Sequence, residues 1–121
     1  MLANFTQKYN ANVWLINTGW SGGRYGVGKR MSLKYTRQII DCIHDGSLEK
    51  SQFQTLPVFN LSVPKSCNGV PSEILNPKET WTDKSGYDET IKKLADKFKS
   101  NMKHFEDKVP KNVLSTGGPV A

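Results

Sequence analysis

Five glycines lie within the twelve residues of the segment 19–30, and this segment constrains the fold more than any other part of the sequence. We expect an irregular loop here, because glycine loses much conformational freedom when it enters a regular element. The apolar run Val13–Ile16 precedes the loop and predicts a strand that is buried on both faces. The segment 32–44 follows with helical spacing, Ser32 as the expected N-cap and Gly46 as the stop. A strand, a glycine loop and a helix in this order are typical of phosphate binding.

Basic residues concentrate in the same region. The net charge is +6, and five basic residues without any acid lie between positions 24 and 37: Arg24, Lys29, Arg30, Lys34 and Arg37. This pattern indicates a local anionic partner. The stretch Gly23–Lys29 fits the first seven places of the P-loop pattern, but Arg30 stands where that pattern needs a magnesium-binding Ser or Thr. The residues alone therefore leave open a nucleotide site, a nucleic-acid-binding surface that includes Tyr25 and Tyr35, and a solvated basic loop.

The length of 121 residues suits a single domain with one modest core. A single buried strand needs sheet neighbours, and the sequence offers few, so we expect a piece of a larger α/β domain. The periodicity predicts a helix over Ala3–Tyr9 and a long amphipathic helix over Ser85–Lys108, with Ser85 and Asp88 as an approximate capping box. Between the helices we expect one or two short strands within Phe53–Val63, interrupted by Pro57, and a loop over Lys65–Asn76. We expect Trp14, Trp20 and Trp81 in the core, the lysines of the last helix in solvent, and residues 115–121 to form a flexible tail.

Two cysteines, Cys42 and Cys67, are too few for a disulfide scaffold, and we expect both to be reduced. With only His44 and His104 beside them, they form no spaced zinc motif, so the sequence predicts no metal ligand and no catalytic residue. No segment approaches the ~20 apolar residues of a membrane helix, and the N-terminus lacks the pattern of a signal peptide. We therefore expect a cytoplasmic protein without a membrane partner.

Several longer motifs are distinctive enough to compare with known families: Val13–Trp20, Gly22–Gly23, Tyr25–Arg30, Thr36–Arg37, Asp45–Leu48, Leu56–Pro57 with Phe59, Val70–Pro77 with Trp81, and Gly118–Pro119. Together they resemble the C-terminal portion of the ATP-dependent phosphoenolpyruvate carboxykinases. The resemblance covers essentially the whole chain. It implies that residues 1–121 are α/β and form part of a C-terminal mononucleotide-binding domain, with a mixed sheet and a long C-terminal amphipathic helix.

The resemblance also implies a function. Members of the family convert oxaloacetate and ATP to phosphoenolpyruvate, ADP and carbon dioxide in gluconeogenesis, with Mg²⁺ or Mn²⁺ held by ligands that would lie upstream of this sequence. By the resemblance, Arg30 and the adjacent Met31 line the nucleotide site, and Thr36 contacts ATP. This chain would then need the rest of the enzyme for activity, and nucleic acid would not be its partner. The alternative is a basic nucleic-acid-binding or structural module without catalysis.

Overall fold

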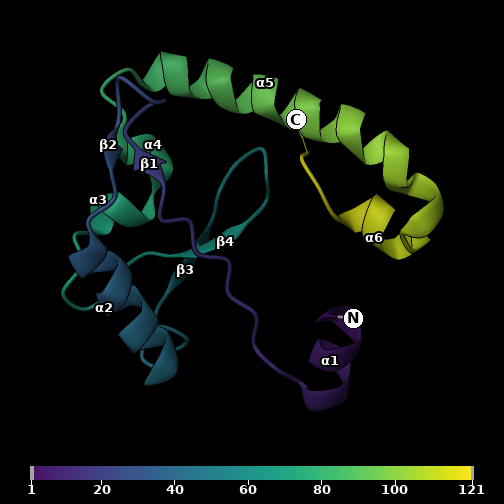
Figure 1. Cartoon of the computed structure of the whole chain (residues 1–121), viewed down its shortest axis with the longest axis horizontal. Helices are drawn as coiled ribbons and strands as arrows, with labels where there is room; N and C mark the ends of the chain where they lie inside the picture. Colours follow the sequence, from purple (N-terminus) through teal and green to yellow (C-terminus); the bar gives the residue numbers. More distant parts are fainter. Residues whose placement is uncertain (1, 121) are drawn as a thin grey trace.

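The computed structural model describes residues 2–120 as a succession of short helices and strands with one long helix near the end (Figure 1). In chain order the elements are α1 (Leu2–Tyr9), β1 (Trp20–Ser21), β2 (Lys29–Arg30), α2 (Leu33–His44), β3 (Phe53–Thr55), β4 (Ser62–Pro64), α3 (Ser72–Leu75), α4 (Pro77–Thr80), α5 (Lys84–Met102), the 3₁₀ helix η1 (Lys103–Lys108) and α6 (Lys111–Thr116). The predicted helices over 3–9 and 32–44 are confirmed.

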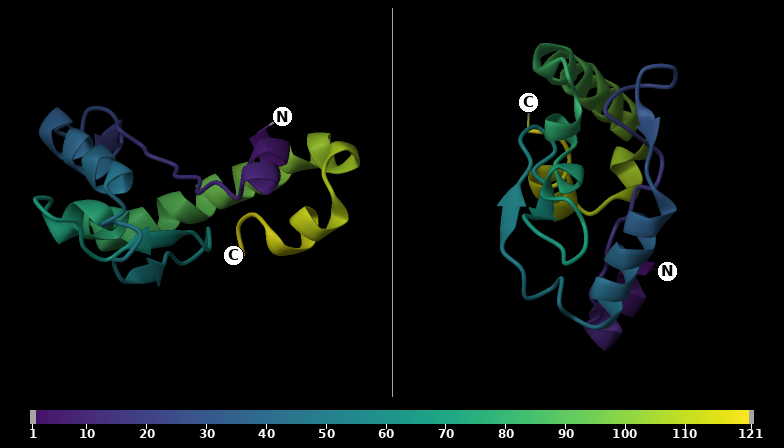
Figure 2. Two further views of the ribbon diagram at one scale, coloured as in Figure 1. Left: turned by 90° about the horizontal axis from the view of Figure 1, so that it is seen from below. Right: turned by 90° about the vertical axis from the view of Figure 1, so that its left-hand side faces the viewer.

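The elements form an elongated molecule. Helix α5 extends along its length, and η1 and α6 turn back beside its C-terminal half (Figures 1 and 2). The elements β1, β2, α2, α3 and α4 gather around the beginning of α5, and an extended segment connects this group to α1 (Figure 1). The glycine loop and the start of α2 therefore lie in the group of elements that includes α3 and α4.

The two sheets are small and separate. Strand β3 pairs antiparallel with β4, in the register Phe53↔Pro64, Gln54↔Val63 and Thr55↔Ser62. This pair confirms the short strands predicted for 53–63, and Pro57 lies in their connection. Strand β1 pairs only with β2, also antiparallel. The described residues thus combine helices with small antiparallel sheets, where the resemblance implied one mixed sheet.

The prediction of a buried strand at Val13–Ile16 is wrong for the described structure. This segment is not part of either sheet, and the exposed fraction reaches 59% for Val13 and 91% for Leu15. A strand needs a neighbour for its backbone hydrogen bonds. Since neither two-stranded sheet of residues 2–120 pairs with it, the segment stays extended without becoming a strand.

The core lies between α2 and the two loops that follow it. Its buried side chains are Cys42, Leu48, Cys67 and Val70, surrounded by the partly buried Trp14, Tyr35, Ile39, Ile43, Ile74 and Leu75. Helix α2 begins where the sequence predicts, because the Ser32 side chain accepts a hydrogen bond from the Lys34 N–H group. Gly46 follows the end of the helix with φ = +74°, which suits glycine. Leu33, the first residue of this helix, is exposed.

The long C-terminal helix differs from its prediction at both ends. Asp83, not Ser85, caps α5, because its carboxylate accepts a hydrogen bond of 2.9 Å from the Gly86 N–H group. After Met102 the chain tightens into η1. The predicted lysine face is confirmed as exposed: Lys92, Lys93, Lys97, Lys99 and Lys103. The apolar stripe is only partly covered, since Tyr87 and Ala95 are buried but Leu94 and Phe98 are exposed.

Two further segments depart from the expected loops. Helix α3 occupies part of the predicted loop 65–76, and α6 extends to Thr116, within the predicted tail. The Val120 N–H group donates to the Val58 carbonyl at 2.7 Å. The flexibility of the tail stays a prediction. The described cysteines are free, and His44 and His104 are exposed.

Candidate functional site

The glycine-rich segment is folded into a hairpin. Strands β1 and β2 form its two arms, in the register Trp20↔Arg30 and Ser21↔Lys29, and the Met31 N–H group donates to the Gly19 carbonyl at 3.0 Å. The prediction that this segment contains no regular element is therefore wrong at its two ends. The hairpin fixes the direction in which β2 enters helix α2.

Glycines make this hairpin possible. Gly22, Gly23 and Gly26 have φ values of +80°, +153° and +88°, a region that other residues rarely adopt. Gly28 is needed for a different reason, because a Cβ atom there would overlap the Gly23 carbonyl and lie 2.7 Å from the Ser21 oxygen. The spacing of the glycines thus matches the positions where the backbone turns or approaches itself closely.

The turn of the hairpin uses two of its own N–H groups. Those of Val27 and Gly28 both donate to the Arg24 carbonyl, at 3.0 and 2.9 Å. A phosphate cradle needs backbone N–H groups that are free to point at the anion. These two groups are already engaged, so the segment 23–29 does not present them to a phosphate in the way its near-match to the P-loop pattern would suggest.

A pocket of about 490 Å³ lies between this hairpin, the start of α2 and the end of α4. Both Arg30 and Met31 line it, so the structure brings these two predicted residues together. The other lining side chains provide a second cation, hydroxyl groups and aliphatic surface: Ser21, Val27, Lys29, Ser32, Tyr35, Ile74, Thr80 and Thr82. Cations suit phosphate groups, hydroxyls suit a sugar, and a thioether with an aliphatic chain suits the face of a base.

Thr36, the third predicted site residue, does not line this pocket. It lies one turn into α2, its side chain is only 7% exposed, and its hydroxyl donates to the Ser32 carbonyl at 3.2 Å. The predicted contact with ATP would need this hydroxyl to rotate or the start of α2 to move. That contact stays a prediction.

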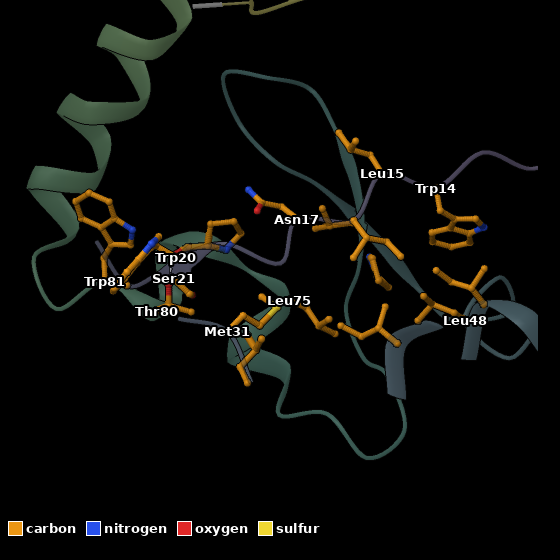
Figure 3. A pocket seen from close by; sticks show the side chains of 18 residues that line it. Trp14, Leu15, Asn17, Trp20, Ser21, Met31, Leu48, Leu75, Thr80 and Trp81 are labelled. Atoms are coloured by element: carbon orange, nitrogen blue, oxygen red, sulfur yellow. Dashed lines mark hydrogen bonds between the residues drawn. The ribbon is translucent and has the colours of Figure 1, made fainter. Parts of the chain in front are cut away.

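A second, more apolar pocket of about 290 Å³ adjoins the first and shares Met31 with it (Figure 3). Its aromatic walls come from Trp14, Trp20 and Trp81, and its floor includes Leu48 and Leu75. Trp14 packs against the core as predicted, but Trp20 is half exposed and stacks edge-on against Tyr25, with 5.0 Å between the ring centroids. The sequence therefore did not predict that the tryptophans line a pocket. The pairing of the β-hairpin, which was not predicted either, would have been needed to place Trp20 there.

The basic side chains of this region are exposed and face solvent: Arg24, Lys29, Arg30, Lys34 and Arg37. In the part of the chain that the structure describes, the ion pairs are formed by lysines of α4 and α5 instead. Within residues 2–120, none of the five cations is in an ion pair with a carboxylate. An anionic ligand would find their charge available.

The described residues do not fit a metal site. Between positions 2 and 120 no three His, Cys, Asp or Glu side chains come together in a group that could hold a metal ion. We therefore assign no metal-dependent step to these residues. Within the same range, no helix is both long enough and apolar enough to cross a membrane.

Comparison with known proteins decides the family. A family model described as phosphoenolpyruvate carboxykinase matches residues 1–73. The chain belongs to the phosphoenolpyruvate carboxykinase family. The hairpin, the start of α2 and the core cysteines all lie within the matched residues, so the pocket that contains Arg30 and Met31 is formed mainly by the family region.

Individual relatives agree with this assignment. The chain is 58% identical over 105 residues to phosphoenolpyruvate carboxykinase (ATP) 2 of Urochloa panicoides. The aligned region is 87% of this chain and 17% of the relative. It is 51% identical over 119 residues to phosphoenolpyruvate carboxykinase (ATP) of Candida glabrata, and this aligned region is 97% of this chain and 22% of the relative. The bacterial enzyme of Caldanaerobacter subterraneus is 50% identical over 107 residues, or 88% of this chain. The chain thus spans about a fifth of the length of these curated relatives.

Proposed function

We propose that this chain forms the nucleotide-side wall of an ATP-dependent phosphoenolpyruvate carboxykinase. The observation that carries the proposal is the common pocket of Arg30 and Met31, which combines unpaired positive charge with an apolar surface. The names of the relatives supply the nucleotide, since they are carboxykinases that use ATP. The whole enzyme converts oxaloacetate and ATP to phosphoenolpyruvate, ADP and carbon dioxide in gluconeogenesis, in the cytoplasm.

The contribution of this chain is positioning. Phosphoryl transfer depends mostly on alignment and on neutralisation of charge, and a divalent cation, Mg²⁺ or Mn²⁺, supplies part of that neutralisation when it is bound to the remainder of the enzyme. The Arg30 guanidinium is planar and always charged, so it can hold a phosphate oxygen or stack on a base. Met31, which the two pockets share, offers its polarisable thioether to the base of the nucleotide. Thr36 would assist only after its hydroxyl leaves the Ser32 carbonyl.

The test replaces Arg30 with alanine in the intact enzyme that contains this segment. We expect ATP affinity to fall by about tenfold or more, because a hydrogen bond to a charged group contributes roughly 1.5–3 kcal/mol. Lys34→Ala is the matched control, since Lys34 is an exposed cation of the same window but does not line the pocket. ATP binding measured by calorimetry should separate the two variants. Equal losses in both would contradict a specific role of Arg30.

The same two variants also test the alternative of a basic nucleic-acid-binding module. Such a module would bind single-stranded nucleic acid through summed charge, and its affinity would fall steeply as salt increases. Arg30→Ala and Lys34→Ala would then weaken binding to a similar extent.

We expect the chain without the rest of the enzyme to show no turnover of oxaloacetate, because the described residues form no metal-binding group.

A further inference from the structure

Two buried thiols from different parts of the fold meet beside the core. Cys42 belongs to the last turns of α2, and Cys67 lies in the loop between β4 and α3. Their exposed fractions are 3% and 7%, and both sulfur atoms lie 3.9 Å from the same acceptor, the Asn68 carbonyl oxygen. The two thiols are also close enough for each to affect the pKa of the other. This is a pair of thiols in one packed cluster, not a lone cysteine.

The surroundings make the two thiols unequal. The pKa of Cys42 is lowered, first by a hydrogen bond from the Ser47 hydroxyl and further by the Gln38 amide and by the Cys67 thiol, against the opposing effects of burial and of Asp45. Gln38 Nε2 donates to the Cys42 sulfur at 3.5 Å. The Ser47 hydroxyl lies beside it and donates to the Cys42 carbonyl at 3.3 Å. Burial raises the pKa of Cys67 to about 11. Cys42 is therefore the thiol that ionises first.

A small pocket adjoins this pair. The two cysteines line a pocket of about 130 Å³ together with Ser47, Ser66 and Asn68, which are all exposed. Hydrogen peroxide is little larger than a water molecule, whose share of liquid volume is about 30 Å³. The hydroxyl and carbonyl groups of the pocket wall offer hydrogen bonds to such a polar molecule.

We propose that Cys42 and Cys67 form a reversible intramolecular disulfide when the protein meets hydrogen peroxide. The Cys42 thiolate attacks one peroxide oxygen, the O–O bond breaks, and the departing hydroxide takes a proton to become water. Cys42 is then a sulfenic acid. The Cys67 sulfur attacks the Cys42 sulfur, the S–O bond breaks, and the hydroxyl leaves as water with the Cys67 proton. Two thiols are oxidised and one peroxide is reduced to two water molecules, and a thiol reductant reverses the step by exchange.

The disulfide would act on the neighbourhood of the pocket that contains Arg30. It would join the C-terminal half of α2 to the loop that leads into α3, and Ile74 of α3 lines that pocket. The loop already approaches α2 closely, since a Cβ atom on Gly69 would lie 3.3 Å from the Gln38 side chain. The crosslink would therefore join two segments that already pack against each other.

The experiment compares the full 121-residue chain in buffer with the same chain in urea. Each sample is treated with hydrogen peroxide, and peptide mapping by mass spectrometry follows the linked Cys42–Cys67 peptide, which is lighter by two hydrogen atoms than the two free peptides. We expect the linked peptide to form about tenfold or more faster in buffer, because the fold holds the two sulfur atoms together. Dithiothreitol should restore both thiols. Equal rates in buffer and in urea, or crosslinks mainly between chains, would overturn the proposal.

Two single variants test the order of the steps. In Cys67→Ser we expect Cys42 to accumulate as a sulfenic acid that dimedone traps, since the resolving thiol is missing. In Cys42→Ser we expect Cys67 to remain a thiol under the same treatment. Dimedone labelling of Cys67 in the second variant at the rate of Cys42 in the first would overturn the assigned roles. Neither measurement depends on ATP binding, so its outcome is separate from that of the proposed function.

Discussion

Alanine at position 28 is expected to open the hairpin that positions Arg30. A Cβ atom on Gly28 would overlap the Gly23 carbonyl and lie 2.7 Å from the Ser21 oxygen. Both obstacles are backbone atoms, so no side-chain rotation relieves them. Overpacking of this kind costs about 1–3 kcal/mol, and two carbonyls on the arm opposite Gly28 place the expected cost near 2 kcal/mol.

Amide hydrogen exchange at Met31 measures this cost locally. The Met31 N–H group donates to the Gly19 carbonyl across the hairpin, at 3.0 Å, so its exchange requires the hairpin to open. A loss of about 2 kcal/mol corresponds to exchange about thirtyfold faster in Gly28→Ala than in the unchanged chain. In the intact enzyme the same variant should also weaken ATP binding, because Arg30 is paired with Trp20 in the register that would be lost.

Gly19→Ala is the matched control in the same hairpin. A Cβ atom there would meet only the Asn17 Oδ1 atom, at 3.1 Å, which belongs to a side chain that can shift at the cost of one exposed hydrogen bond from the Gly19 N–H group. Alanine also reduces the freedom of the unfolded chain, which favours the folded state slightly. We expect the Met31 exchange rate to change by less than about threefold in this variant. Unchanged exchange in Gly28→Ala, or an equally large increase in Gly19→Ala, would refute the argument from backbone overlap.

Two stability predictions follow from the core and from the cap of α5. Leu48 is 2% exposed in the core cluster, so Leu48→Ala should lower the free energy of unfolding by about 2–5 kcal/mol, and an unchanged urea midpoint would contradict that burial. Asp83→Ala should cost about 1 kcal/mol, because it removes the side chain that accepts the Gly86 N–H group. Ser85→Ala should stay within about 0.5 kcal/mol, and a larger loss there than at Asp83 would restore the cap predicted from the sequence.

Local signals explain why helix α2 was predictable. Ser32 caps its first turn and Gly46 ends it, and both effects depend on the residue and its immediate neighbours. The cap of α5 shows the limit of this reasoning. Ser85 and Asp88 have the approximate spacing of a capping box, but Asp83 lies two residues earlier and its carboxylate reaches the Gly86 N–H group. The sequence spacing favoured Ser85, and the path of the chain into α5 places the Asp83 carboxylate at the Gly86 N–H group instead.

The hairpin could not be predicted from its own sequence, because each arm pairs over only two residues and shows no alternation. Only part of the pocket lining could be predicted, for a related reason. The resemblance supplied Arg30 and Met31, whereas the proximity of Trp20 and Trp81 to Met31 depends on how β1 and α4 pack. The meeting of Cys42 and Cys67 likewise has no signal in their spacing, since it arises only when the loop after β4 folds against α2.

The exposed segment Val13–Ile16 shows what an apolar run does and does not encode. Its continuous β-branched and aromatic character is typical of a strand covered on both faces, and burying a side chain such as Leu15 contributes about 1.5–3 kcal/mol. That contribution is missing here, since Leu15 is 91% exposed. The run therefore specifies an environment and not a conformation: it becomes a strand only where neighbouring strands supply both hydrogen bonds and cover. The two small sheets of residues 2–120 supply neither, whereas the relatives are about five times longer than the matched region. The same reasoning supports the proposal that this chain acts as one wall of a larger enzyme, because this uncovered apolar segment directly precedes the hairpin that contains Arg30.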